Sequence, residues 1–288
     1  MEGNIESRQS NSSSSLLDPF TVHVTNCLSV KLYQDCRPNC LETAPLQKGL
    51  VLVLRGRELI EEGMGFGVPV VKYKDKTYFS SSANSWLRKE GDSCTLGKMF
   101  VLDTISRKRI GQGSYVNDKL YHFLHRAFEI GYLNFQSLTH ISNKIIELQE
   151  PLNVQTIFKR VEPRGTVLFE YSCKPKEIQI TVRLSLSKLD KCKEILILNE
   201  QGSSFFRRYA DSSGLVLFDR NIGPWAKVNA NEASFSDAKQ TSKFTLESRL
   251  STTLVRGWEK TKGHLAWAGL EYSVPSRNTS FSYSIRLS

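Results

Sequence analysis

The chain has 288 residues, of which 40% are hydrophobic and 24% charged, a composition typical of an ordinary globular protein that can bury a sizeable core. No apolar run approaches the roughly 20 residues that cross a bilayer. The Ser- and Asn-rich N-terminus lacks the basic start and apolar centre of a signal peptide. We therefore expect no membrane partner and a cytoplasmic location.

Positive charge is concentrated in the second half of the chain. The net charge is +10, and residues 151–288 carry 21 Lys and Arg against 13 Asp and Glu, whereas residues 1–150 carry 18 against 16. Such an excess favours an anionic partner. Because no dense basic run occurs, basic side chains spread over solvated strand faces are the simpler interpretation. A polyanion stays an alternative partner, and the sequence does not specify an oligomeric state.

The first part of the chain is expected to be a disordered tail followed by a β region. Residues 1–18 are rich in Ser and Asn and lack periodicity. The region 19–116 has strand signals at 20–33 and 50–54 and a hairpin signal at 70–79. Lys72, Lys74 and Lys76 would share one face, as in an edge strand protected by lysines; a row of anion-binding lysines is the alternative. Residues 80–98 are predicted as a loop or short helix, and 99–104 and 109–115 as strands.

A loop between two of these strands carries glycine at alternate positions, Gly63, Gly65 and Gly67, with Glu61 and Glu62 at its lip. Glycine adopts backbone angles that other residues resist, so this loop can pass close to another backbone or to a ligand. The spacing is too short for a dinucleotide fingerprint, and a hairpin follows where a helix should begin. A structural bend or β-bulge is the favoured interpretation.

The hydrophobic period becomes helical at 117–150. Two segments separated by Gly131, the second ending at Pro151, predict a helical pair packed against one sheet. One face of the first helix carries four potential metal ligands: Asp118, His122, His125 and Glu129. Since that face lies opposite the apolar one, a solvated polar face is the simpler explanation.

The six cysteines are expected to be free thiols, because no secretory signal precedes them. His23, Cys27, Cys36 and Cys40 have a spacing reminiscent of zinc ligands. If 20–33 is one strand, however, His23 and Cys27 lie roughly 13 Å apart, which is too far for two ligands of one ion. No metal and no cofactor are expected.

The region 151–288 is rich in strand signals. A period of two is clear at 178–186 and 281–287. Further strands are expected at 166–172, 194–198, 215–218, 243–246 and 264–272, separated by turn residues. The predicted fold class is therefore mainly β, a large antiparallel β-sandwich with a short two-helix insertion, and residues 19–288 could form one domain.

Aromatic and acidic residues near the turns of the second half suit a sugar, because rings stack on the apolar face of a pyranose and polar groups bond its hydroxyls. The candidate ligand-binding residues, besides the loop glycines, are Trp225, Trp258, Trp267 and Tyr272. Glycoside chemistry needs two carboxylates about 5–9 Å apart. One would be Glu61 or Glu62, and the other Glu200, Asp211, Glu259 or Glu271.

The overall plan of residues 20–288 resembles the supersandwich of galactose-mutarotase-like proteins and polysaccharide-lyase C-terminal domains. The resemblance is one of architecture without motifs, since the paired catalytic His and Glu of the mutarotases match no positions here. It implies a carbohydrate-binding or carbohydrate-processing protein, although architecture alone does not fix function. The alternative is a non-catalytic protein that binds nucleic acid or another polyanion through its basic half, where residues 205–209 (FFRRY) interleave aromatics with arginines.

Overall fold

The computed structural model describes residues 18–25, 27–34, 46–61, 63–74, 76–90, 93–110, 154–223, 225–261, 265–276 and 278–288. The predicted tail, apart from Asp18, lies outside these residues, as do the predicted helical pair at 117–150 and its polar stripe. Within the described ranges the helical elements are two short 3-10 turns, η3 (Leu189–Lys191) and η4 (Asp219–Asn221), so the fold is mainly β. No helix in these ranges is long and apolar enough to cross a membrane.

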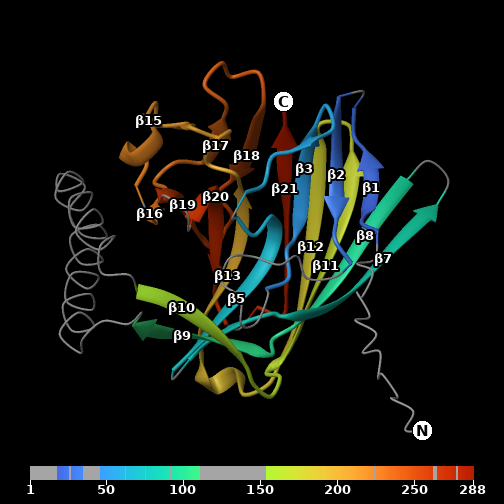
Figure 1. Cartoon of the computed structure of the whole chain (residues 1–288), viewed down its shortest axis with the longest axis vertical. Helices are drawn as coiled ribbons and strands as arrows, with labels where there is room; N and C mark the ends of the chain where they lie inside the picture. Colours follow the sequence, from blue (N-terminus) through green and yellow to red (C-terminus); the bar gives the residue numbers. More distant parts are fainter. Residues whose placement is uncertain are drawn as a thin grey trace, which may run out of the picture.

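One sheet, which we call sheet A, has 12 strands in the described part of the chain, all paired antiparallel. Its main path is β1–β2–β3–β5–β13–β20–β19–β16 (Figure 1). The bounds along this path are β1 Phe20–His23, β2 Leu28–Leu32, β3 Leu50–Leu54, β5 Phe66–Tyr73, β13 Cys192–Gln201, β20 Leu265–Val274, β19 Thr253–Thr261 and β16 Ala226–Lys227. Four short or peripheral strands join it, β4 Arg57–Glu58, β6 Thr77–Phe79, β9 Thr104–Ile110 and β10 Val154–Arg160.

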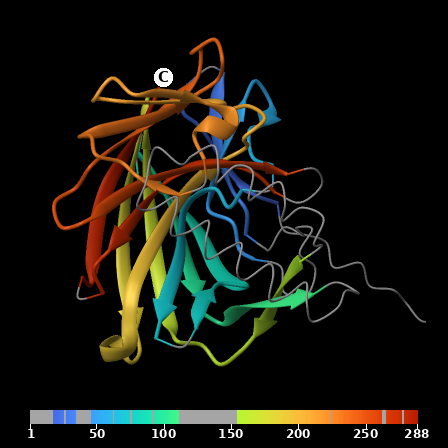
Figure 2. The same ribbon diagram turned by 90° about the vertical axis from the view of Figure 1, so that its left-hand side faces the viewer.

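The other sheet, sheet B, has nine strands among the described residues, in the order β15–β14–β17–β18–β21–β12–β11–β8–β7. Their bounds are β15 Val216–Phe218, β14 Arg208–Asp211, β17 Glu232–Ser236, β18 Lys243–Glu247, β21 Ser280–Leu287, β12 Glu177–Leu186, β11 Gly165–Lys174, β8 Ser93–Val101 and β7 Ser82–Glu90. Both sheets combine strands from the two halves of the chain. Figure 2 shows one such junction, where β13 (gold) rises from η3 beside β5 (cyan).

Aromatic rings from the two sheets meet in a common core. Phe66 of sheet A contacts Phe244 of sheet B with ring centroids 5.1 Å apart, and Tyr272 of sheet A contacts Tyr283 of sheet B at 5.0 Å. The period of two predicted for β12 and β21 is confirmed, because alternate residues of both strands are buried: Ile178, Ile180, Val182, Tyr283, Ile285 and Leu287. The predicted antiparallel sandwich is thus present in the described residues as two sheets around one core.

Strand β5 carries a β-bulge at Gly67. Leu198 of β13 lies opposite Val68, but its neighbour Asn199 lies opposite Phe66, so Gly67 is an extra residue in the ladder. Its φ is +73°, in the left-handed region that favours glycine, and its N–H donates to Asn199 Oδ1 at 3.2 Å. The favoured interpretation of the glycine loop as a structural bend is confirmed at this position.

The prediction of a loop or short helix at 80–98 is wrong. The segment forms β7 and β8, which pair antiparallel at one edge of sheet B. An edge strand is solvated on one side, so it tolerates the Ser, Asn and Lys residues that concealed its pattern. Trp86 lies over Gly97, where an added Cβ would come within 2.1 Å of the indole ring.

The predicted strand at 20–33 is wrong in its continuity, because it forms two strands, β1 and β2, joined by a tight turn. Phe20 pairs with Leu32 and Val22 with Val30, so the apolar residues still share one face. His23 faces Ser29 across this hairpin, and Cys36 and Cys40 lie outside the described residues.

The prediction that the lysines of the 70–79 hairpin protect an edge strand is also wrong. Strand β5 is interior to sheet A, between β3 and β13. Lys72 lies opposite Glu194 of β13, and its Nζ is 2.9 Å from Glu194 Oε2. The lysine therefore neutralises a carboxylate across the ladder.

Candidate functional site

Sheet A has one face toward sheet B and one face away from it, which we call the outer face. Asn199 of β13 points toward sheet B, where its Oδ1 accepts a hydrogen bond from Tyr283 Oη at 2.7 Å. Side chains alternate along a strand, so the next residue, Glu200, points to the outer face. Tyr272 of β20 likewise packs on Tyr283, which places Glu271 on the outer face.

Glu200 and Glu271, which we call the carboxylate pair, are diagonal neighbours on this face. Glu271 lies opposite Leu198, and Glu200 is two residues further along β13. Diagonal neighbours in an antiparallel ladder have Cα atoms roughly 7–8 Å apart. Each side chain is only 5% exposed. Two of the predicted catalytic candidates therefore lie together, and both are buried.

The surroundings of Glu200 bring the pKa of its carboxyl group close to neutral pH. Burial raises the pKa of Glu200 to about 7, and the nearby Glu259 carboxylate adds to that effect. The Met64 N–H, which donates to Glu200 Oε2 at 3.0 Å, and the Lys48 ammonium act in the opposite direction. A carboxyl group with this pKa can both accept and release a proton at physiological pH.

Glu271 is held more firmly in its protonated form. Burial raises the pKa of Glu271 well above its usual value, and the charges of Glu200 and Glu194 raise it further, while Lys72 opposes them. Two interacting carboxyl groups in such surroundings titrate as a coupled pair. At neutral pH the pair therefore holds a proton donor beside a proton acceptor.

The glycine loop lies directly against this pair. Lys48 Nζ donates to Gly63 O at 2.8 Å and to Glu61 O at 3.4 Å, and these two hydrogen bonds hold the loop in place. A Cβ added to Gly63 would lie 3.4 Å from Trp267 Cβ and 3.5 Å from Glu200 Cβ. The loop, one carboxylate and one tryptophan thus meet at one place on the outer face.

Two tryptophans stack beside the carboxylate pair. The Trp225 and Trp267 rings have centroids 4.5 Å apart and planes inclined by 18°. They lie over Gly257 of β19, where an added Cβ would come within 2.7 Å of the Trp267 ring and 2.8 Å of the Trp225 ring. Trp267 is buried and Trp225 is partly exposed, so the stack has its accessible surface on Trp225.

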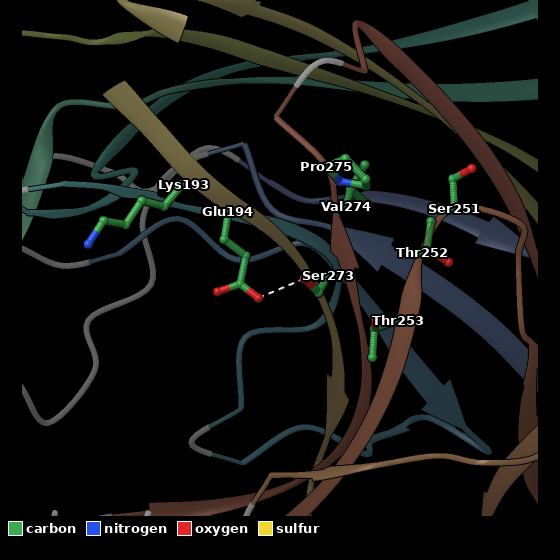
Figure 3. Close-up of a pocket in the computed structure, with 8 residues that line it drawn as sticks. All are labelled: Lys193, Glu194, Ser251, Thr252, Thr253, Ser273, Val274 and Pro275. Carbon is green, nitrogen blue, oxygen red and sulfur yellow. Dashed lines mark hydrogen bonds between the residues drawn. The ribbon is translucent and has the colours of Figure 1, made fainter. Parts of the chain in front are cut away.

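An open pocket of about 460 Å³, which we call the end pocket, lies where β13 begins and β20 ends (Figure 3). Its lining consists of Lys193, Glu194, Ser251, Thr252, Thr253, Ser273, Val274 and Pro275. Glu194 Oε1 accepts a hydrogen bond from Ser273 Oγ at 2.6 Å (Figure 3). Burial alone would raise the pKa of Glu194, but the bonds from Ser273 and Lys72 together hold it below its usual value. The pocket therefore contains an ionised carboxylate among hydroxyl groups.

Other predicted catalytic residues lie elsewhere. Glu61 accepts a hydrogen bond from the Ser204 N–H at 3.1 Å, in an exposed position. Asp211 belongs to sheet B, where it accepts from Tyr209 Oη at 2.7 Å and closes its own turn. Glu62 lies outside the described residues.

Two of the predicted ligand-binding aromatics face the core. Trp258 Nε1 donates to Phe206 O at 3.2 Å, and Tyr272 Oη donates to Glu247 O. Gly65 packs against the backbone of β3, with a φ of +87°. The structure therefore brings together Gly63, Glu200, Trp225, Trp267 and Glu271 on the outer face, but not Trp258 or Tyr272.

Sequence reasoning did not identify four polar residues of this region: Lys48, Lys72, Glu194 and Ser273. Lys72 was recognised only as part of a lysine row, and Ser273 carries no motif. One signal in the sequence could have identified Ser273. It is two residues from Glu271, and residues two apart in a strand point to the same face of the sheet.

The described residues contain no group of three or more His, Cys, Asp or Glu side chains that could hold a metal ion. The FFRRY segment also offers little to a nucleic acid. Phe206 and Tyr209 are buried, and Arg207 pairs with Asp219 at 2.7 Å. Buried rings cannot stack on bases, so this segment gives the polyanion alternative no support.

Comparison with known proteins finds likeness in architecture. The chain matches no model of a known protein family, and no curated protein matches it. Alpha-N-acetylgalactosaminidase NagBb from Bifidobacterium bifidum is similar over 94% of this chain, with 6% identity and a TM-score of 0.49; this chain spans 36% of that protein's length. The Slr1438 protein from Synechocystis sp. PCC 6803 is similar over 96% of this chain and 99% of its own, with 11% identity and a TM-score of 0.41.

A galactose mutarotase-like protein from Lactobacillus casei is similar over 94% of this chain and 99% of its own, with 9% identity and a TM-score of 0.38. The resemblance to this galactose mutarotase-like protein is one of low sequence identity, without a family match. It assigns no role to any residue of this chain.

Proposed function

We propose that the protein binds a carbohydrate in the end pocket and that the carboxylate pair exchanges protons with the bound sugar. The observation that supports this proposal is the position of the pair on the face that carries the pocket. Along β20 the outward-facing residue next to Ser273 is Glu271. A ligand seated on Ser273 thus has the buried carboxyl group as its nearest neighbour along the strand.

The lining of the end pocket suits the chemistry of a sugar. Hydroxyl groups of Ser251, Thr252, Thr253 and Ser273 both donate and accept hydrogen bonds, and the ionised Glu194 accepts them. Sugar hydroxyls also do both, so each can be satisfied in such a lining. The ion pair between Lys72 and Glu194 orients the carboxylate before a ligand arrives.

The carboxylate pair supplies the acid and the base that sugar chemistry at the anomeric carbon requires. Exchange of anomers removes a proton from the anomeric hydroxyl and delivers one to the ring oxygen, and cleavage of a glycosidic bond also needs an acid and a base. In this assignment Glu271 is the acid, and Glu200 is the base that its pKa of about 7 permits.

The binding step can be tested with a panel of monosaccharides and oligosaccharides. We expect at least one sugar to raise the melting temperature of the protein, and Ser273→Ala to weaken its binding about three- to tenfold, because one hydrogen bond is lost. Ser282→Ala on the exposed face of β21 is the matched control, since it removes the same hydroxyl from a strand of sheet B that does not line the pocket. If no sugar shifts the melting temperature, the proposal is wrong.

The chemical step can be tested on the sugar that binds. Anomer exchange and glycoside cleavage would be followed by nuclear magnetic resonance, with Glu271→Gln and Glu200→Gln as variants. Loss of a general acid or base costs about 10²–10⁴ in rate, so each variant should lose at least 100-fold while still binding the sugar. Unchanged rates in both variants would exclude the carboxylate pair from the chemistry.

A further inference from the structure

Two cysteines lie at the same end of the β8–β11 ladder in sheet B, away from the outer face of sheet A. Thr95 of β8 pairs with Ser172 of β11 in an antiparallel ladder. The next pair in that register is Cys94 with Cys173, and both belong to their strands. Burial raises the pKa of the Cys173 thiol to about 12, with a further contribution from the neighbouring Cys94. Both the strand register and the effect of Cys94 on the pKa of Cys173 therefore place the two cysteines close together.

Directly opposed residues in an antiparallel ladder suit a disulfide. Their side chains point to the same face, and their Cα atoms are about 4.5 Å apart at a non-hydrogen-bonded position or about 5.5 Å at a hydrogen-bonded one. Both values lie within the range of roughly 4.4–6.8 Å that a disulfide spans. A backbone spacing of this kind is one that a disulfide can bridge.

The pair is also accessible. Cys94 is two residues from Leu96, and Cys173 is two residues from Tyr171, so each cysteine points to the same face of sheet B as a fully buried side chain. The two cysteines are nevertheless partly exposed, because they lie at the ends of their strands. Both are free thiols in the structure. A small oxidant can therefore reach the two sulfur atoms, and each cysteine has the other as a neighbour with which it can form a disulfide.

We propose that Cys94 and Cys173 are an oxidative modification site, at which a hydroperoxide converts the two thiols into a disulfide that joins β8 to β11. The Cys94 sulfur attacks the peroxide, so that an S–O bond forms, the O–O bond breaks and one water leaves when the oxidant is hydrogen peroxide. The Cys173 sulfur then displaces the hydroxyl of the Cys94 sulfenic acid, forming the S–S bond and releasing a second water. Two electrons pass from the two thiols to the peroxide.

Cys94 is the residue that reacts first. Its pKa is raised by burial, but Lys89, which lies opposite it on β7, acts against that rise. Cys173 has Ile178 of β12 as its other neighbour in the ladder and no such cation. The thiolate is the attacking species, so the first step belongs to the cysteine beside the lysine.

The test is a peptide map of the full-length protein after treatment with hydrogen peroxide, followed by alkylation of the remaining thiols. Trypsin cleaves after Lys89 and Lys98 and after Arg164 and Lys176, because Pro175 protects Lys174. We expect mass spectrometry to find peptides 90–98 and 165–176 joined, each with one cysteine, and dithiothreitol to separate them. The oxidised protein should also melt at a higher temperature, since the bond closes a long loop.

Two variants sharpen the result. Cys94→Ser must abolish the joined peptide and the shift in melting temperature, whereas Cys27→Ser, which removes an exposed thiol elsewhere, must leave both unchanged. The peptide map of the wild-type protein is sufficient to test the proposal, even if a variant fails to fold. If Cys94 and Cys173 are recovered alkylated, or oxidised to sulfinic acids, or joined to other cysteines, in a protein whose near-ultraviolet circular dichroism is native, the proposal is wrong.

Discussion

Glu200 and Glu271 occupy positions where a sheet usually places apolar side chains. Their neighbours on the outer face include Leu196, Leu198 and Val70, all of which are buried. Removing a carboxylate from water is costly unless it is paired or protonated. The raised pKa values of both carboxyl groups reflect this cost, and the chain nevertheless carries glutamate here and not leucine or valine. Retaining such groups at a stability cost is typical of functional positions.

The raised pKa of Glu200 predicts a pH dependence of stability. Between pH 4.5 and about 7 the unfolded chain releases this proton while the folded chain keeps it, so the contribution of Glu200 to stability falls as pH rises through that range and levels off above it. Glu271, whose pKa is raised well above its usual value, adds a fall in the same direction. The difference between the two pKa values of Glu200 corresponds to on the order of 3 kcal/mol. Glu200→Gln should remove the part of the fall that Glu200 causes, leave the part that Glu271 causes, and be more stable than wild type at pH 8.

Urea unfolding at several pH values measures this effect, with Glu162→Gln, an exposed glutamate, as the control. The control should keep the wild-type slope between pH 4.5 and 7. Identical slopes for Glu200→Gln and wild type would mean that Glu200 has an ordinary pKa in the folded protein.

At the scale of elements, glycines decide how closely strands approach. Gly67 allows β5 to bulge at the point where it meets β13, and Tyr171 Oη of sheet B donates to Gly67 O at 3.0 Å across the core. An added Cβ would lie 2.8 Å from Tyr171 Oη and 3.0 Å from Phe169 Cδ1. The bulge is therefore a contact point between the two sheets as well as a bend.

Gly67→Ala should destabilise the protein more than a glycine substitution on open backbone. Both the left-handed φ and the crowding against Tyr171 oppose it, so we expect a loss of about 2–4 kcal/mol. Gly56→Ala is the matched control, because Gly56 has a φ of +81° with no atom within 4 Å of the added Cβ. Thermal unfolding should show a loss of only about 1 kcal/mol for the control. Equal losses would refute the role of the core contact.

Strands with one buried face could be predicted from the sequence, whereas the edge strand β7 could not. In β12 and β21 a period of two separates core from solvent, so both strands were predicted. In β7 neither face is fully buried, and its composition resembles a loop. Strand β19 was missed because Arg256 and Trp258 both face inward, Arg256 over the Tyr209 ring at 4.8 Å.

The candidate site shows the same limit. Glu200, Glu271 and Trp267 could be nominated as residue types that suit a sugar. Lys72 and Glu194 could not be linked, because their contact depends on the pairing of β5 with β13, more than 100 residues later in the chain. Register between distant strands is set by the whole core and not by local sequence.

At the scale of the whole molecule, the two halves of the chain are interleaved. In sheet A, β5 of the first half pairs with β13 of the second, and in sheet B, β8 of the first half pairs with β11 of the second. Neither half therefore contains a complete sheet. This connectivity predicts one folding unit and not two domains joined by a linker.

We therefore expect the full-length protein to unfold in one cooperative transition, and neither half to fold alone. Without β5, strand β13 would become an edge with Ile195, Ile197 and Leu198 exposed, a surface prone to aggregation. Urea unfolding followed by tryptophan fluorescence and by far-ultraviolet circular dichroism should give coincident curves, because Trp86 reports on the first half and the other three tryptophans on the second. A fragment of residues 151–288 should lack the near-ultraviolet signal of packed aromatics. If that fragment unfolds cooperatively on its own, the second half is a domain and the interleaved sheets are an interface between two.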